Sequence, residues 1–131
     1  MRILLDTHII VYWISDPDRL TSAQQHAVQS VSSGSPAYVA DISLWEIAML
    51  VSGGRLRLDR QLREWLARAT APPLVRIAEI TPEIAATVAE LQDWENRDPA
   101  DRLIVATAMV HGCHLLTNDS AIRESKLVSV V

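Results

Sequence analysis

The sequence predicts an α/β fold in which helices cover a parallel sheet. Short apolar runs alternate with longer segments that carry helix start and stop signals, a pattern typical of parallel sheets with helical connections. Several of the apolar runs end at or beside an acidic residue. With 131 residues, 49% of them hydrophobic, the chain can bury roughly two-thirds of its unfolded surface as a single domain over residues 1–131.

Short apolar runs bounded by polar or turn-forming residues are the candidate strands. They cover residues 2–6, 37–40, 74–78, 113–117 and 127–130. Their composition suits buried strands of a parallel sheet, because both faces of such a sheet are covered.

The predicted helices are bounded by capping residues, by proline at the first helical position and by glycine at the end. They run from Thr21 to about Val31, from Ser43 to Val51 before Gly53-Gly54, from an Asp59 cap through Thr70, from Thr81-Pro82 to about Trp94, and from Asp98-Pro99 to Gly112.

Two acidic residues fall at the ends of predicted strands. Asp6 closes the first strand, and Asp119 follows the strand at residues 113–117. Ligands of parallel α/β sheets bind beyond the carboxyl ends of the strands, so both positions suit a functional site. Asp is also favoured as a helix cap or turn residue, and that alternative stays open for each.

Glu46 lies in a predicted helix that is apolar on almost every face and is therefore expected to be largely buried. No Lys or Arg lies within one helical turn of it. A carboxylate in such surroundings needs a partner, which can be a metal ion or an arginine from elsewhere in the chain.

Asp98 and Asp101 are three residues apart, so both carboxylates project from the start of one helix. Capping can explain Asp98, and the helix dipole favours Asp101. The following residues 103–110 are continuously apolar, which predicts a central buried helix whose acidic start faces a cation.

Several carboxylates at one place would repel one another unless a cation compensates. Oxygen ligands suit Mg²⁺ or Mn²⁺ rather than Zn²⁺, and the histidines His8, His26, His111 and His114 lack helical zinc spacing, so they are predicted to be structural or peripheral. The lone Cys113 is predicted to be a buried thiol. Thr7, Thr117 and Asn118 flank the acids, either to orient carboxylates or bound water or as ordinary polar residues of strand ends.

The net charge of −4 does not exclude a nucleic acid substrate. If five of the 16 acids form a metal site, 11 acids remain against 12 bases, and the rest of the surface is near neutral. This balance argues against tight binding of nucleic acid by charge alone. The arginine-rich stretch 55–68 could line a groove for phosphate, although pairs of Arg60 and Arg68 with Glu64 on a solvated helix are favoured. The tryptophans Trp13, Trp45, Trp65 and Trp94 are predicted to pack in the core or at a partner interface.

Asp6 and His8 interrupt the first apolar run too early for a signal peptide, and no later stretch is long enough for a membrane span. We therefore expect a cytoplasmic protein, and a single cysteine suits that reducing compartment.

Four motifs in order carry a family resemblance: Leu-Leu-Asp-Thr-His at residues 4–8, Ser-Leu-Trp-Glu-Ile-Ala at 43–48, Asp-Pro-Ala-Asp-Arg at 98–102, and Leu-Leu-Thr-Asn-Asp at 115–119. With them the chain resembles PIN-domain ribonucleases, specifically VapC-type toxins of type II toxin–antitoxin systems. The resemblance implies a three-layer α/β/α sandwich with a central parallel sheet. It carries the catalytic and metal-binding acids over to Asp6, Glu46, Asp101 and Asp119, with Asp98 as an additional metal-binding acid.

The resemblance also implies the reaction and the partners. A water activated by Mg²⁺ or Mn²⁺ would attack an RNA phosphodiester, so that no protein nucleophile is required. The substrate would be tRNA, rRNA or mRNA. The partners would be a second copy of the chain in a homodimer and a VapB-type antitoxin.

Of three other classes of protein, two require an acidic residue that this chain lacks. A phosphotransferase of the haloacid dehalogenase type needs a second Asp where this chain has His8, and a receiver domain needs an acidic pair that is missing before Asp41. The remaining alternative is a catalytically silent PIN-like module that binds RNA or protein without cleaving it. Metal binding would separate this module from a nuclease.

Overall fold

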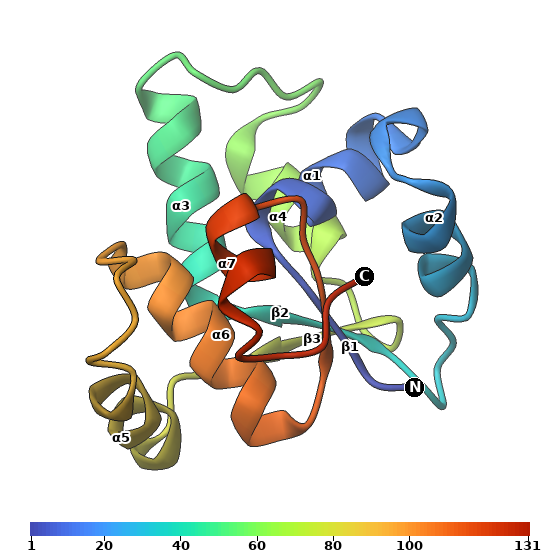
Figure 1. Cartoon of the computed structure of the whole chain (residues 1–131). Helices are drawn as coiled ribbons and strands as arrows, with labels where there is room; N and C mark the ends of the chain where they lie inside the picture. The colour runs from blue at the N-terminus through green and yellow to red at the C-terminus, as the bar shows by residue number, and fades with distance from the viewer.

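The computed structural model describes residues 1–131 and shows a parallel sheet between two layers of helices (Figure 1). The sheet has four strands in the order β3-β2-β1-β4. They are β1 (Ile3–Leu5), β2 (Ala37–Ala40), β3 (Val75–Ala78) and β4 (His114–Leu116). The predicted three-layer α/β/α class is confirmed.

The strand order reverses beside β1. The chain builds β2 and β3 on one side of β1 and then crosses back to place β4 on the other side. Leu5 of β1 is in register with Val39 of β2 and with Leu116 of β4. Such a reversal leaves a crevice at the carboxyl ends of the two diverging strands, here β1 and β4.

Eight helical segments surround the sheet. They are α1 (Thr7–Ser15), the short 3-10 helix η1 (Pro17–Arg19), α2 (Ser22–Gln29), α3 (Asp41–Ser52), α4 (Leu62–Ala69), α5 (Pro82–Glu90), α6 (Pro99–His111) and α7 (Ser120–Ser125). The caps predicted at Thr21, Thr81 and Asp98 are all present. Gly112 ends α6 in the left-handed conformation, with φ of 64°.

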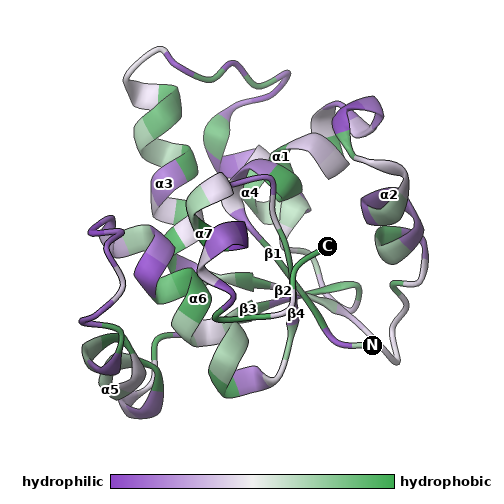
Figure 2. Cartoon of the chain, viewed as in Figure 1, coloured by the Kyte–Doolittle hydropathy of each residue, from purple (hydrophilic) through white to green (hydrophobic).

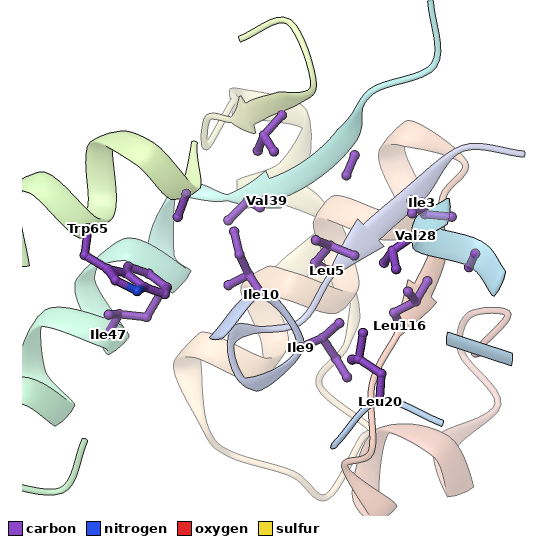
Figure 3. Close-up of a cluster of buried hydrophobic side chains, with 14 residues drawn as sticks. Ile3, Leu5, Ile9, Ile10, Leu20, Val28, Val39, Ile47, Trp65 and Leu116 are labelled. Atoms are coloured by element: carbon purple, nitrogen blue, oxygen red, sulfur yellow. The ribbon is translucent and has the colours of Figure 1, made fainter. Parts of the chain in front are cut away.

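Two hydrophobic clusters fill the space on the two faces of the sheet. The first packs Ile3 and Leu5 against α1, α2 and α4, with the fully buried Trp65 at its edge (Figure 3). The second packs Leu4 and Leu115 of the opposite face against α5, α6 and α7. Figure 2 shows the strands in mostly hydrophobic colours, while the loop between α5 and α6 is strongly hydrophilic. The clusters thus make a rigid support for residues at the strand ends.

Two helices, α1 and α7, lie where the sequence predicts no element. Asp6 and Asp119 cap them, so each acid that was expected at a strand end is also the N-cap of the next helix. The capping alternative for these residues is therefore correct as a statement of geometry. It does not remove them from the site, because each cap uses one carboxylate oxygen.

Several predicted boundaries are wrong. Asp59 does not cap α4, which starts at Leu62 after Gln61 and has no side-chain cap. The helix that opens at Pro82 ends at Glu90 rather than near Trp94, because turns follow it. The predicted strand 127–130 is reduced to one parallel bridge between Val130 and Leu115.

Helix α3 is less buried than its apolar sequence predicts. Only Ser43 and Ile47 are buried in it, whereas Trp45 is 57% exposed and Met49 is 47% exposed. These two residues are four apart, so they share one outward face. None of the helices is long and apolar enough to cross a bilayer.

Candidate active site at the carboxyl end of the sheet

A cleft of about 430 Å³ opens at the carboxyl ends of β1 and β4. Its walls hold all the acids that the sequence singled out: Asp6, Glu46, Asp98, Asp101 and Asp119. They come from the end of β1, from α3 and from the starts of α6 and α7. A neighbouring hollow of about 680 Å³ shares Asp98, Asp101 and Asp119 with this cleft, so the acidic surface continues toward α7.

Asp6 lies at the base of the cleft and is only 4% exposed. Its backbone amide continues the sheet by donating to Leu116 O at 3.0 Å. Its Oδ1 accepts from the Thr7 amide at 2.8 Å, and its Oδ2 accepts from Thr117 Oγ1 at 2.6 Å. These bonds hold the carboxylate in one orientation at the point where β1 and β4 end.

Glu46 reaches the cleft from α3. Thr7 Oγ1 lies 2.5 Å from Glu46 Oε1, to which it donates, and 2.9 Å from Ser43 Oγ. Burial raises the pKa of Glu46, and the nearby charges of Asp6 and Asp98 raise it further against the opposing effect of the Thr7 hydrogen bond. The carboxylate is thus oriented by a hydroxyl but held where a negative charge is unfavourable.

At Asp101, too, a hydrogen bond favours the charged carboxylate while burial disfavours it. Asn96 Nδ2 donates to Asp101 Oδ2 at 2.9 Å. Burial nevertheless raises the pKa of Asp101 to about 6, with further contributions from the charges of Asp98, Asp119 and Asp6. These carboxylates therefore act on one another across the cleft.

Asp98 caps α6 with a single oxygen. Its Oδ1 accepts from the amides of Ala100 at 2.9 Å and Asp101 at 3.1 Å. Its own amide donates to Asn96 Oδ1 at 2.9 Å, so one asparagine side chain orders both acids of the motif.

Arg102 fixes the loop that carries Asn96. Its buried guanidinium donates to three backbone carbonyls, those of Asn96 at 2.7 Å, Leu91 at 2.8 Å and Trp94 at 2.6 Å. The planar five-donor group of arginine is suited to gathering several acceptors in this way. Arg102 thus ties the loop 91–97 to the start of α6.

Thr117 joins the two strand-end acids. Its hydroxyl donates to Asp6, as described above, and accepts from the Asp119 amide at 3.0 Å. Asp119 Oδ1 accepts from the Ile122 amide at 2.9 Å, which caps α7. Of the two roles left open for Asn118, the hydrogen bond that its Oδ1 accepts from Gln24 Nε2 at 2.8 Å favours that of an ordinary polar residue at a strand end.

His8 lines the cleft, although the sequence predicts a structural or peripheral role for it. Its Nε2 accepts from the Asn118 amide at 2.9 Å, so in the neutral ring the proton is on Nδ1. Nδ1 lies 3.6 Å from Asp6 Oδ2. His8 therefore belongs to the wall of the site next to its most buried acid.

Residues 3–126 match the PIN-domain family. The chain belongs to this family. It is also 38% identical over 124 residues to Ribonuclease VapC22 of Mycobacterium tuberculosis. The matched residues make up 95% of this chain and 92% of the relative. The predicted resemblance to VapC-type PIN-domain proteins is confirmed.

Solved structures show the same PIN-domain fold. VapBC2 from Rickettsia felis, bound to a DNA fragment from its promoter, matches with a TM-score of 0.75 at 18% identity and covers 100% of this chain and 98% of that one. FitAcB from Neisseria gonorrhoeae matches with a TM-score of 0.65 at 25% identity and covers 98% of this chain and 95% of that one. VapBC-1 from nontypeable Haemophilus influenzae matches with a TM-score of 0.69 at 17% identity, covering 100% and 97%.

The side chains of this PIN-domain cleft have the chemistry of a site for a hard cation. All five acids offer oxygen atoms, which Mg²⁺ and Mn²⁺ prefer. As they stand, no three acidic, histidine or cysteine side chains converge closely enough to hold an ion. Mutual repulsion of the carboxylates favours such a spread arrangement. The pKa values of Glu46 and Asp101 are raised mainly by burial, and the charges of the neighbouring acids add to that effect.

Two further predictions agree with the structure. Glu64 pairs with Arg60 at 3.2 Å and with Arg68 at 3.5 Å, as predicted for a solvated helix face. Cys113 is a buried free thiol, and burial raises its pKa to about 11.

Sequence reasoning missed Ser43, Asn96 and Arg102 as supports of the acids. The only signal for Asn96 was its place two residues before a capping Asp, which suits a short side-chain turn. Ser43 and Arg102 lie within the motifs that carry the family resemblance, but their contacts were not predictable, because tertiary packing sets their partners.

Proposed function

We propose that this PIN-domain protein is a divalent-metal-dependent endoribonuclease toxin of the VapC type. The observation that carries the proposal is the gathering of five acids from four segments of one domain around a single cleft. The 38% identity to a protein named as a ribonuclease supports the choice of RNA. The extent of the domain, residues 1–131, stays a prediction within this proposal.

The roles of the residues follow from their surroundings. Asp6, Glu46 and Asp101 would be the core ligands of Mg²⁺ or Mn²⁺, because hydrogen bonds from Thr7, Thr117 and Asn96 orient them. Asp119 and Asp98 each keep one carboxylate oxygen outside the cap hydrogen bonds, available for a second ion or for orienting water. A bound ion would supply water activation and neutralisation of phosphate charge.

Hydrogen bonds within the chain fix the positions of the acidic side chains before any ligand binds. Thr7 and Thr117 hold the carboxylates in place, and the rigid strand ends keep them at the base of the cleft, so little reorganisation is needed when substrate binds. His8 is positioned beside Asp6, where its Nδ1 proton can hydrogen-bond to a carboxylate or a substrate oxygen.

The competing proposal is a catalytically silent PIN-like module that binds RNA or protein. The presence of all five acids, together with their hydrogen-bonded supports, favours the nuclease. A silent module would have no need for carboxylates held against their mutual repulsion.

The deciding experiment is cleavage of total cellular RNA by the purified protein with Mg²⁺, Mn²⁺ or EDTA. We expect discrete fragments that depend on metal and disappear in Asp6→Asn, a change that keeps the size of the side chain and one of its two acceptor oxygens. Asp59→Asn, an exposed acid outside the cleft, is the matched control and should cleave normally. A folded, metal-loaded protein that cleaves no RNA would favour the silent module. Parallel Asp98→Asn and Asp119→Asn assays show which of the two acids is essential.

We also propose a VapB-type antitoxin as the cognate partner. Several structural neighbours are named as VapBC or toxin–antitoxin complexes. A hollow of about 490 Å³ beside the acids is walled by Ile42, Trp45 and Pro99 together with Glu46 and Asp98. An apolar anchor next to a basic side chain is the chemistry that would fill it. Adding the antitoxin to the cleavage assay should inhibit the wild type more than Trp45→Ala.

The homodimer and the cytoplasmic location stay predictions from the family resemblance. Light scattering of the purified chain measures the first directly.

A further inference from the structure

Two arginines stand on the rim of the acidic cleft without an acidic partner. Arg19 and Arg55 both line the cleft together with the five acids. Neither takes part in the ion pairs of the structure, which are His8 with Asp6, Arg60 with Glu64 and Arg68 with Glu64. Both arginines are exposed, so their charges are available to a ligand that enters the cleft.

Arg19 is held next to the ring of Tyr12, which in turn contacts the ring of His8. Its guanidinium carbon lies 4.6 Å from the centre of the Tyr12 ring, and the His8 ring packs edge-on against Tyr12 at 5.7 Å. The backbone at Arg19 is fixed by η1, in which its amide donates to Asp16 O at 3.1 Å. The next residue, Leu20, is buried in the core, so the segment that carries Arg19 is anchored to the fold.

Arg55 is fixed by the end of α3. Its amide donates to Leu50 O at 2.9 Å, which closes the last turn of the helix. This closure passes through Gly54, whose φ of 73° is a conformation that glycine adopts without strain. The side chain of Arg55 therefore leaves the backbone at a defined point on the wall of the cleft.

We infer that His8, Tyr12, Arg19 and Arg55 form a substrate wall that binds the nucleotide next to the scissile phosphate of single-stranded RNA. This inference rests on the proposed ribonuclease function. Five carboxylates repel a phosphate backbone, so a cleft that accepts RNA needs cations beside the acids, and these two arginines supply them. Arg55 contacts the flanking phosphate, while Tyr12 and Arg19 stack against the base.

The choice of a single strand follows from the aromatic part of the wall. Tyrosine rings and arginine planes recognise bases that are unstacked, whereas the bases of a duplex are stacked on one another and are not presented to such a surface. The substrate wall therefore selects an exposed loop or end over a helix.

The test measures binding rather than cleavage, in Asp6→Asn full-length protein that leaves the RNA intact. A labelled single-stranded RNA of mixed sequence is titrated at several salt concentrations. We expect Tyr12→Ala to weaken binding by roughly tenfold and Tyr12→Phe to bind like the parent, because only the ring face is needed. We expect Arg55→Ala to lower the slope of log affinity against log salt by about 0.7, the value for one contact to a single strand. Arg60→Ala, which lies outside the cleft, should leave the slope unchanged.

The outcomes separate the two proposals. If the parent binds RNA but the Tyr12, Arg19 and Arg55 variants bind equally well with the same salt slope, the substrate wall is wrong and the nuclease proposal stands. A duplex that binds as tightly as the single strand also overturns the wall. If the parent binds no RNA and the wild type cleaves none, both proposals fail.

Discussion

Asp101 is a single carboxylate whose negative charge is disfavoured by burial and by the neighbouring acids. Its pKa is raised from 3.8 to about 6, so the folded protein holds this proton more tightly than the unfolded chain. Stability linked to Asp101 is therefore fully present below pH 3.8 and is lost as the pH rises toward about 6. Glu46, whose pKa is also raised, acts in the same direction.

We therefore expect the metal-free protein in EDTA to gain stability as the pH falls from 7 toward 5. Asp101→Asn cannot ionise at this position, so this part of the pH dependence should be missing from it. Urea unfolding of both proteins over that range measures the difference. If the free energy of unfolding depends on pH equally in the two proteins, the Asp101 carboxylate is not destabilised by burial and neighbouring charges.

At the scale of elements, the loop between α5 and α6 depends on Arg102. Replacing Arg102 by Met would leave three backbone carbonyls without their donor, and we expect a loss of about 3 kcal/mol in the free energy of unfolding. Arg102→Lys should recover only part of this loss, because an ammonium group cannot reproduce the planar fork. The matched control is Arg97→Met in the same loop, an exposed residue expected to change stability by less than about 0.5 kcal/mol. Equal effects at positions 97 and 102 would refute the role of Arg102.

The helices and strands also differ in how far the sequence could predict them. The four strands of the sheet and the acids at its edge were predictable, because Asp6 and Asp119 follow short apolar runs that are typical of buried strands, although the similar run at 127–130 forms only one bridge. Helix α1 was not, since Ile9, Ile10 and the aromatic residues after them locally favour a strand. Burial of Ile9 and Ile10 in the core overrides that preference. The links of Thr7 to Glu46 and of Asn96 to Asp101 were also out of reach, because they arise from packing between separate elements.

At the scale of the whole molecule, the two clusters around the sheet support a site that is itself unfavourable without a cation. The core packs on both faces of β1, so removing a cleft charge should leave the fold intact. We expect Asp6→Asn/Asp101→Asn to be more stable than the wild type in EDTA, because a buried charge is removed at Asp101 and fewer carboxylates repel one another.

Adding Mg²⁺ or Mn²⁺ should reverse this order. A ligand present at about 100 times its dissociation constant stabilises the folded state by roughly 2.7 kcal/mol, and only a protein that keeps the cleft acids can gain it. Thermal unfolding of the wild type, the double variant and Asp59→Asn, each with EDTA and with metal, measures both effects. Asp59→Asn should follow the wild type, since Asp59 is exposed and outside the cleft. If metal stabilises the double variant as much as the wild type, the ion binds elsewhere. If the double variant is unfolded in EDTA, the acids hold the fold together, and their gathering at one cleft has a structural cause.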